Sequence, residues 1–301
     1  MRFGARGGRP QRVWLSSRPM SQQATLAAPV EVDGIGLHSG DSVQVRLRPA
    51  PERTGIVFVR ADRPGSPHVP ALFGNVIDTT LATTLASGGA SVATVEHLVA
   101  ALVALRIDNV LVDVHGPELP VLDGSAEPWM KLLDRAGRAE QVAHAARIVV
   151  RRRVEVVSGE RRASLTPCDG FEVAATIDFP HPLIGRQSLG VALDNGQFAR
   201  ELAWARTFGF LHEVDALRRA GLARGGSLDN AVVYGDDGVM NPEGLRAPDE
   251  PVRHKLLDLV GDLGLLGARL QGRLEAVRPG HGITLALLRV LLADPDAYSR
   301  V

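Results

Sequence analysis

The chain has 301 residues, 45% of them hydrophobic and 23% charged, and at about 150 residues per domain this length predicts two globular domains. Basic and acidic residues number 34 each and aromatic residues make up 4%, so neither charge nor base stacking indicates a nucleic-acid partner. No apolar run reaches the roughly 18 residues of a membrane-spanning helix, and the single cysteine, Cys168, excludes an internal disulfide and favours a reducing, cytoplasmic compartment.

Residues 1–20 differ from the rest of the chain in composition. Residues 1–29 carry five arginines and no acidic residue. The segment lacks the apolar centre of a secretion signal, whereas transit peptides share its richness in arginine and serine. We expect a disordered basic leader over residues 1–20, and a start codon assigned too early, with Met20 as the true start, would account for it.

The stretch from residue 21 to residue 142 contains patterns of both strands and helices. Val43, Val45 and Leu47 alternate with polar neighbours, as in a half-buried strand. Ser125 is placed to cap a helix whose first turn tolerates Pro128, because a proline there costs no hydrogen bond. The pattern predicts strands at residues 43–48, 56–59 and 109–114, and helices at residues 93–105 and 125–137.

The stretch from residue 147 to residue 301 repeats this mixture. A Ser158-Gly159 turn separates two runs that are typical of strands. The triplets Val95–His97 and Val252–His254 each open an apolar helix, about one domain length apart, which fits a duplicated α/β unit whose two helices face each other. The pattern predicts strands at residues 147–157, 161–165 and 171–179, and helices at residues 201–205, 214–220 and 251–266.

Three polar residues of the last helix form a candidate metal site. His254, Asp258 and Asp262 recur at every fourth position, so the first two lie on one helix face and can converge on one ion. An imidazole and a carboxylate suit Zn²⁺, but catalytic zinc usually takes three protein ligands. His97, at the start of the other apolar helix, is the natural third ligand. Taken alone, a helical H-x-x-x-D pattern is more often a solvated face or a local ion pair.

Two further residues are candidates for proton transfer. Glu96 adjoins His97, so its carboxylate can reach a water molecule at the proposed metal site. His281 lies between two glycines, which permit a tight turn that aims the imidazole into a cleft. On a purely structural interpretation, Glu96 is a surface carboxylate and His281 a turn histidine.

Seven short segments of the sequence carry a resemblance to a known family. In order and spacing they are similar to the UDP-3-O-acyl-N-acetylglucosamine deacetylases, which act in lipid A synthesis in Gram-negative bacteria, and the resemblance covers about residues 21–298. The segments are Gly34–Gly40 (GIGLHSG), Ala93–Leu98 (ATVEHL), Leu119–Ser125 (LPVLDGS), Ala205–Phe210 (ARTFGF), Gly225–Asn230 (GGSLDN), Arg253–Asp258 (RHKLLD) and Gly280–Gly282 (GHG).

The resemblance implies an α+β fold of two similar domains, residues 21–142 and 147–301, each a β-sheet packed on a pair of helices, with the active site between them. It implies one catalytic Zn²⁺ held by His97, His254 and Asp258. The implied reaction is hydrolysis of the N-acetyl group of UDP-3-O-acyl-N-acetylglucosamine, which gives the free amine and acetate. We expect a cytoplasmic monomer.

The resemblance also implies catalytic roles for four residues. Glu96 matches the general base of the family, and His281 matches its catalytic histidine. Thr207 matches the hydroxyl that helps to hold the developing oxyanion, and Asp262 matches the carboxylate that orients the histidine. Either His281 or protonated Glu96 can supply the proton that the leaving amine needs.

Substrate contacts follow from the same resemblance. Lys255 matches a substrate-contacting lysine, and Phe208 and Phe210 belong to the inserted segment that walls the acyl-chain passage. The paired lysines that some members have after the first domain are missing, which leaves Arg147 and nearby arginines as candidate diphosphate contacts. Arg278 stands where a lysine often precedes the Gly-His pair.

Two alternative functions remain open at the level of the sequence. A serine hydrolase that uses Ser227 and Asp229 would normally show a G-x-S-x-G elbow, and the sequence has none. A non-catalytic sugar-nucleotide binding protein of the same fold is the second alternative. The presence of Glu96, His281 and all three candidate metal ligands argues against it.

Overall fold

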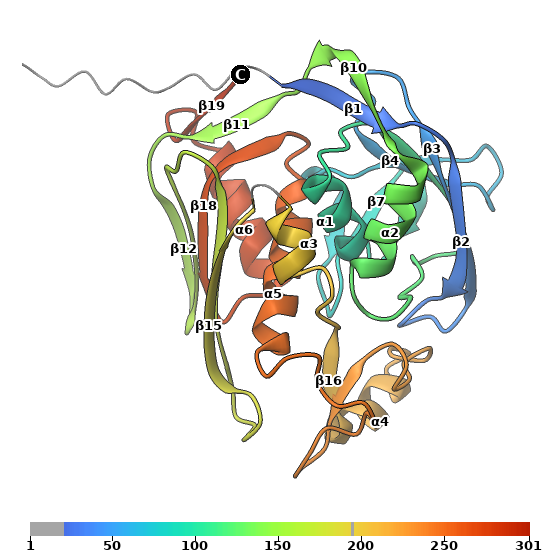
Figure 1. Ribbon diagram of the computed structural model, residues 1–301, viewed down its shortest axis with the longest axis vertical. Coiled ribbons are helices and arrows are strands. Elements are labelled where there is room, and N and C mark those ends of the chain that lie inside the picture. The colour runs from blue at the N-terminus through green and yellow to red at the C-terminus, as the bar shows by residue number, and fades with distance from the viewer. Residues whose placement is uncertain (1–20, 194–195) are drawn as a thin grey trace, which may run out of the picture.

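The computed structural model describes residues 21–193 and 196–301, and the predicted leader at residues 1–20 lies outside them. Figure 1 shows two halves side by side, with sheets at the outside and helices at the centre. Six α-helices and several sheets are present in the described residues, so the predicted α+β fold class is confirmed. No helix among these residues is long and apolar enough to cross a membrane.

The N-terminal half is built on a five-stranded sheet with the strand order β2-β3-β9-β4-β5. Val43, Val45 and Leu47 are buried in β3 while their neighbours are exposed or half-buried, so the predicted alternation is confirmed. β9 runs parallel to β4, and the chain between them passes through α1. The strands are β2 (Val30–Ile35), β3 (Ser42–Pro49), β4 (Ile56–Arg60), β5 (His68–Pro70) and β9 (Val110–His115).

The N-terminal half also contains two smaller sheets. A short sheet of β6 (Val76–Asp78), β7 (Thr84–Ser87) and β8 (Ala90–Val92) leads into α1 (Glu96–Ala104), and the 3-10 helix η1 (Phe73–Asn75) precedes it. β1 (Gln22–Leu26) pairs antiparallel with β10 (Arg138–His144).

The second helix of the N-terminal half, α2, spans Glu127–Ala136. It starts two residues later than predicted, because Ala126 and not Ser125 occupies the capping position. The Ser125 hydroxyl still accepts a hydrogen bond from the backbone N–H of Glu127, at 3.2 Å, and Pro128 lies in the first turn as predicted.

The C-terminal half is built on a seven-stranded sheet. Its main order is β12-β13-β18-β11-β19, and β14 pairs with both β15 and β18. The strand predicted over residues 147–157 is interrupted, since β11 and β12 lie at different places in the sheet. The strands are β11 (Arg147–Val150), β12 (Val154–Ser158), β13 (Arg161–Thr166), β14 (Phe171–Phe179), β15 (Gly185–Ala192), β18 (Arg269–Val277) and β19 (Tyr298–Arg300).

Four helices belong to this half: α3 (Gln197–Glu201), α4 (Leu211–Arg219), α5 (Glu250–Gly264) and α6 (His281–Leu292). The helix predicted at residues 251–266 is confirmed, whereas the helix predicted at residues 201–205 is wrong. α3 ends at Glu201, and the next residues turn so that the backbone N–H and guanidinium of Arg206 bind the buried Glu250. β16 (Phe208–Phe210) and β17 (Val232–Tyr234) pair in parallel beside α4, at the bottom of Figure 1.

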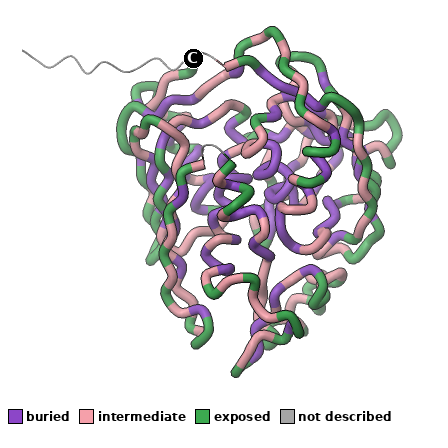
Figure 2. The backbone as a smooth tube through the Cα atoms, in the orientation of Figure 1, coloured by how far each residue is buried: buried purple, intermediate pink, exposed green. Residues whose placement is uncertain are grey.

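The two halves meet where α1 packs against α5, in the buried centre of the molecule (Figure 2). Two glycines of α5 permit this close approach. A Cβ atom on Gly261 would lie 2.2 Å from the Glu96 carbonyl oxygen, and one on Gly264 would lie 2.5 Å from the Val99 side chain. The first turn of α1 is therefore held directly against the C-terminal part of α5.

Candidate metal centre and active site

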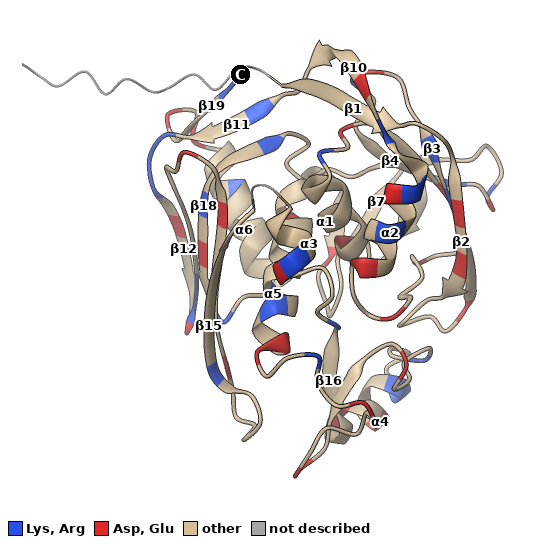
Figure 3. Cartoon of the chain, viewed as in Figure 1, with Lys and Arg blue, Asp and Glu red and all other residues tan. Residues whose placement is uncertain are grey.

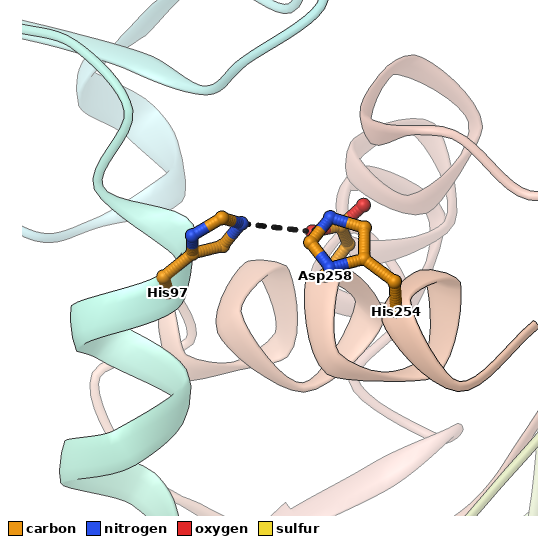
Figure 4. A group of neighbouring side chains, drawn as sticks. All are labelled: His97, His254 and Asp258. Carbon is orange, nitrogen blue, oxygen red and sulfur yellow. Dashed lines mark ion pairs between the residues drawn. The ribbon is translucent and has the colours of Figure 1, made fainter. Parts of the chain in front are cut away.

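The contact between α1 and α5 brings together the three predicted metal ligands. The candidate donor atoms of His97, His254 and Asp258 all lie within 4.8 Å of one another, and all three residues are buried. The Nε2 atoms of His97 and His254 lie 3.6 Å and 3.4 Å from Asp258 Oδ1. Figure 4 shows the His97 ring extending from α1 toward the pair on α5.

The geometry of this cluster fits a tetrahedral cation. Ligand atoms at about 2.0–2.2 Å from a tetrahedral zinc ion lie about 3.3–3.6 Å apart, which is the spacing observed between the imidazoles and the carboxylate. His254 Nδ1 lies 3.0 Å from the Ala205 carbonyl oxygen and donates its hydrogen there, which leaves the Nε2 lone pair free to coordinate.

The charge state of the cluster also suits a cation. Burial lowers the pKa of His254 to about 3, so this imidazole is neutral. Burial alone favours a neutral Asp258, but the positive charge of the adjacent Lys255 ammonium helps to hold its pKa well below the usual range. The Lys255 ammonium lies 2.8 Å from Asp258 Oδ2, the oxygen that does not face the imidazoles. Two neutral imidazoles and an ionised carboxylate are what divalent zinc requires.

Glu96 lies at the first turn of α1, beside the cluster. Its side chain is buried, and burial raises its pKa above the usual value. The backbone N–H of Thr83 donates to Glu96 Oε2 at 3.2 Å, and the Thr83 hydroxyl donates to Asp262 at 2.9 Å. Thr83 therefore links the candidate base to the carboxylate behind His281, a role that no motif in the sequence indicated.

His281 and Asp262 form a buried pair. His281 Nδ1 lies 2.9 Å and 3.0 Å from the two Asp262 carboxylate oxygens, and Nε2 lies 3.9 Å from Glu96. Burial acts to lower the pKa of His281, but the charge and hydrogen bond of Asp262 more than offset it and raise the pKa to about 10. The predicted tight turn at His281 is wrong: Gly280 has an extended backbone, and His281 is the first residue of α6.

The entry to α1 is strained. Thr94 has a φ of 56°, which is unfavourable for a β-branched residue and typical of functional sites. Its hydroxyl donates to the buried Glu118 at 2.7 Å. Glu118 also accepts the backbone N–H groups of His38 and Ser39, so the Gly34–Gly40 segment is tied to the start of α1.

A pocket of about 20 Å³, enough for one water molecule, lies among these groups. His38 Nδ1 accepts the Ala223 N–H, so its proton is on Nε2, which has no partner among the described residues. Thr207 lines the pocket as well. The lining residues are Leu37, His38, Leu81, Thr94, Glu96, His97, Thr207, His254, Lys255 and Asp258.

An aromatic cluster adjoins the pocket. The Phe208 ring lies 6.3 Å from that of His254 and 5.6 Å from the Lys255 ammonium. Phe208 and Phe210 both contact Phe179 and Tyr234. The structure therefore brings the predicted substrate residues Lys255, Phe208 and Phe210 to one side of the metal cluster.

Two predicted basic contacts lie elsewhere. Arg147 lines a separate, larger cavity and not the pocket of the cluster. Arg278 forms ion pairs with Glu160 and Asp178. Ser227 and Asp229 hydrogen-bond to each other, with the Asp229 N–H donating to the Ser227 hydroxyl, and no contact places a histidine beside them within the described ranges.

The site combines a donor set of two histidines and one aspartate with a buried carboxylate and an imidazole bound to a second carboxylate. This combination is typical of hydrolases that use a metal ion and a general base. Here this set is assembled from both halves of an α+β fold. The fold and the site together define that class of protein.

The chain belongs to the UDP-3-O-acyl N-acetylglycosamine deacetylase (LpxC) family, whose model matches residues 23–293. It is 48% identical over 285 residues to the UDP-3-O-acyl-N-acetylglucosamine deacetylase of Myxococcus xanthus, with 94% of this chain and 91% of the relative covered. It is 51% identical over 278 residues to the protein of that name from Phenylobacterium zucineum, with 92% and 95% covered. The resemblance of the seven segments is thus confirmed.

Proposed function

We propose that this protein hydrolyses the N-acetyl group of UDP-3-O-acyl-N-acetylglucosamine, releasing acetate and the free amine, in lipid A biosynthesis. Membership of the family and the names of relatives about 50% identical support this function. The observation that carries it is the convergence of His97, His254 and Asp258 beside Glu96 and the His281–Asp262 pair.

His97, His254 and Asp258 are proposed to hold one Zn²⁺. When bound, zinc polarises a carbonyl and lowers the pKa of a bound water molecule toward about 7. The ionised Asp258 and the neutral, carbonyl-anchored His254 support this assignment. We also propose that the chain divides into domains at residues 21–142 and 147–301, with the acyl-chain insert in the second. Membership of the family supports this division.

Glu96 is proposed as the general base. It accepts a proton from the attacking water molecule, and its position at the single-water pocket supports this role. Its raised pKa places proton acceptance and release closer to neutral pH. Attack on the acetamide carbon puts negative charge on the former carbonyl oxygen, which must be held by donors.

The Thr207 hydroxyl and the protonated His281 are proposed as those donors. Well-placed donors of this kind each lower the activation free energy by about 3–4 kcal/mol. Asp262 keeps the His281 ring oriented and charged by accepting the Nδ1–H of the imidazolium, which leaves Nε2–H facing Glu96. The C–N bond then breaks, and the amine takes a proton from His281 or from Glu96.

The remaining assignments concern the substrate. Lys255 is proposed to contact the polar part of the substrate, and Phe208 and Phe210 to wall the passage of the acyl chain. Their aromatic neighbours and their proximity to His254 support this arrangement. The cytoplasmic location and the monomeric state stay predictions from the sequence.

The test combines metal analysis with a turnover assay on the purified full chain. We expect about one zinc per chain, acetate release from UDP-3-O-acyl-N-acetylglucosamine, and loss of activity after chelation that zinc restores. A Ser227→Ala variant is the matched control and should retain activity. A zinc-loaded protein that binds the substrate without releasing acetate would instead favour the non-catalytic binding protein.

A further inference from the structure

Residues 205–207 lie between two groups of the proposed active site. The Ala205 carbonyl oxygen accepts the Nδ1–H of His254, which directs Nε2 of that ring toward the metal cluster. Two residues later, Thr207 lines the single-water pocket. The course of these three residues therefore determines both the orientation of the ligand His254 and the position of the Thr207 hydroxyl.

Arg206, in the middle of this segment, is bound to Glu250, the first residue of α5. The backbone N–H and the Nε of Arg206 donate to Glu250 Oε1 at 3.1 Å and 2.9 Å, and a terminal guanidinium nitrogen donates to Oε2 at 3.2 Å. Glu250 Oε2 also accepts the backbone N–H of Arg246 at 2.7 Å. These donors fill the roughly four lone-pair positions that a carboxylate offers. Because two of them are backbone groups, Glu250 holds the main chain as well as a side chain.

Glu250 belongs to the face of α5 that carries the metal ligands. It precedes His254 by four residues and Asp258 by eight, so the three side chains follow one another at every helical turn. Successive turns of α5 thus bind successive residues of one segment, since Glu250 binds Arg206 and His254 binds Ala205. Where α5 begins, Figure 3 shows acidic and basic segments close together.

The ion pair of Arg206 with Glu250 is buried, with exposed fractions of 2% and 1%. Burial acts to lower the pKa of Arg206, but the hydrogen bond and the charge of Glu250 more than offset it, so the pair is ionised. Desolvation of two charges largely cancels their attraction, so a buried pair adds little stability compared with apolar residues of similar volume. What it does supply is direction, because a planar guanidinium meets a carboxylate in a fixed geometry.

The N-terminal half of the molecule contacts the same segment. The backbone N–H of Thr207 donates to the Gly124 carbonyl oxygen at 2.8 Å. Arg246 donates to Asp123 Oδ2 at 2.9 Å and to the Trp204 carbonyl oxygen at 2.6 Å. Asp123 and Gly124 belong to a motif to which the proposed mechanism assigns no role. The segment is therefore held from both halves of the molecule.

We propose that Glu250 is a positioning residue of the deacetylation reaction. By holding Arg206, it orients the Ala205 carbonyl group that fixes the His254 ring, and it places the Thr207 hydroxyl where the oxyanion forms. This role rests on the proposed function. A purely structural Glu250 would only stabilise the start of α5, where a negative charge is favourable. The two roles differ in what they predict for kcat and for zinc affinity.

The experiment compares Glu250→Gln with the native full chain in kcat, KM, zinc affinity and thermal stability. We expect kcat to fall about 10–10²-fold with KM changed less than about threefold, because a group that acts in the transition state is displaced. Zinc should bind about tenfold more weakly, since the support of a ligand is lost. Glu250→Asp keeps the charge next to Arg206 but shortens the side chain. It should show the same changes in kcat and zinc affinity with a smaller loss of stability, so the test does not depend on whether Glu250→Gln folds.

A double-mutant cycle with Thr207→Val shows whether Glu250 acts through the hydroxyl. In the native background Thr207→Val should lower kcat by about 10²–10³-fold. In the Glu250 variants it should lower kcat by no more than about tenfold, because the hydroxyl is already displaced there. Equal losses in the two backgrounds would overturn the positioning role, as would an unchanged kcat in a folded Glu250 variant.

Asp62→Asn is the matched control for lost stability. It removes the carboxylate partner of another buried arginine, Arg60, at the end of β4. It should lower thermal stability and leave kcat and zinc affinity unchanged, and an equal fall in kcat would show that lost stability alone explains the effect of Glu250→Gln. Absence of acetate release by the native protein would count against the proposed function, whereas the zinc affinities of the variants would still test Glu250.

Discussion

The charge of His281 depends mainly on one carboxylate, that of Asp262, and removing this carboxylate gives a strong test of the proposed chemistry. The pKa of about 10 lies about 3.5 units above the ordinary 6.5, and at 1.36 kcal/mol per unit this corresponds to about 5 kcal/mol in favour of the imidazolium. Asp262 supplies the main charge and the hydrogen bond that raise the pKa, against burial that lowers it.

In Asp262→Asn, burial prevails and the pKa of His281 falls by several units, although Glu96 and Asp258 still act to raise it. Turnover in the native protein should decline as the pH rises through the pKa of His281, at or somewhat below 10 because a bound cation lowers it. In the variant this basic limb should move to the acidic side by several units. Loss of a charged donor should reduce kcat at pH 8 by about 10²–10³-fold, with little change in KM.

The assay is the pH dependence of kcat between pH 5 and 10, together with an NMR titration of the His281 ring. Thr83→Val is the matched control, because it removes one hydrogen bond to Asp262 but leaves the negative charge in place. A hydrogen bond is worth about 1 kcal/mol net, so its basic limb should move by less than one unit. Identical basic limbs in the native protein and in Asp262→Asn would refute the assignment of His281 as a charged donor.

Three further predictions concern the metal and the contact between the halves. Glu96→Gln should keep about one zinc per chain in metal analysis and lose activity by about 10²–10⁴-fold, and a metal-free variant would contradict its role as base. His254→Ala should lose zinc, because two donors remain. Gly261→Ala should lower both thermal stability and zinc content, because its Cβ would meet the Glu96 carbonyl oxygen, whereas Gly74→Ala, with open space at its Cβ, should do neither.

Local sequence patterns predicted much of the fold. β3 and α5 follow periodicities of two and of 3.6 that are set by their own side chains. The prediction of a helix at residues 201–205 was wrong because a distant contact, and not the local side chains, determines the structure there. Leu202, Ala203 and Ala205 are buried in a turn whose course is fixed by the ion pair of Arg206 with Glu250, 44 residues further along the chain. Such a long-range constraint leaves no local pattern.

Some residues of the candidate site could be predicted from the sequence, and others could not. Patterns on single helices indicated His254, Asp258 and the pairing of Glu96 with His97, and family resemblance supplied Thr207 and the partners of His281. Thr83 and Glu118 were not predicted, because their roles depend on contacts between segments that are adjacent only after folding. The backbone N–H groups that Glu118 accepts come from His38 and Ser39, about 80 residues away, so no local pattern marks it.

The contact between α1 and α5 determines both the metal cluster and the position of the base. Gly261 lies against the carbonyl group of Glu96, so the residue proposed to take the proton and the ligand that follows it, His97, are fixed by one backbone approach. On the same helix, Asp258 lies about one turn before Gly261 and Asp262 directly follows it. A change that separates the helices by a few tenths of an ångström therefore alters the ligand spacing, the distance from Glu96 to His281 and the helix packing together. For this reason metal content should fall in step with stability across variants of this contact, and a variant that loses packing but keeps full zinc occupancy would show that the two are independent.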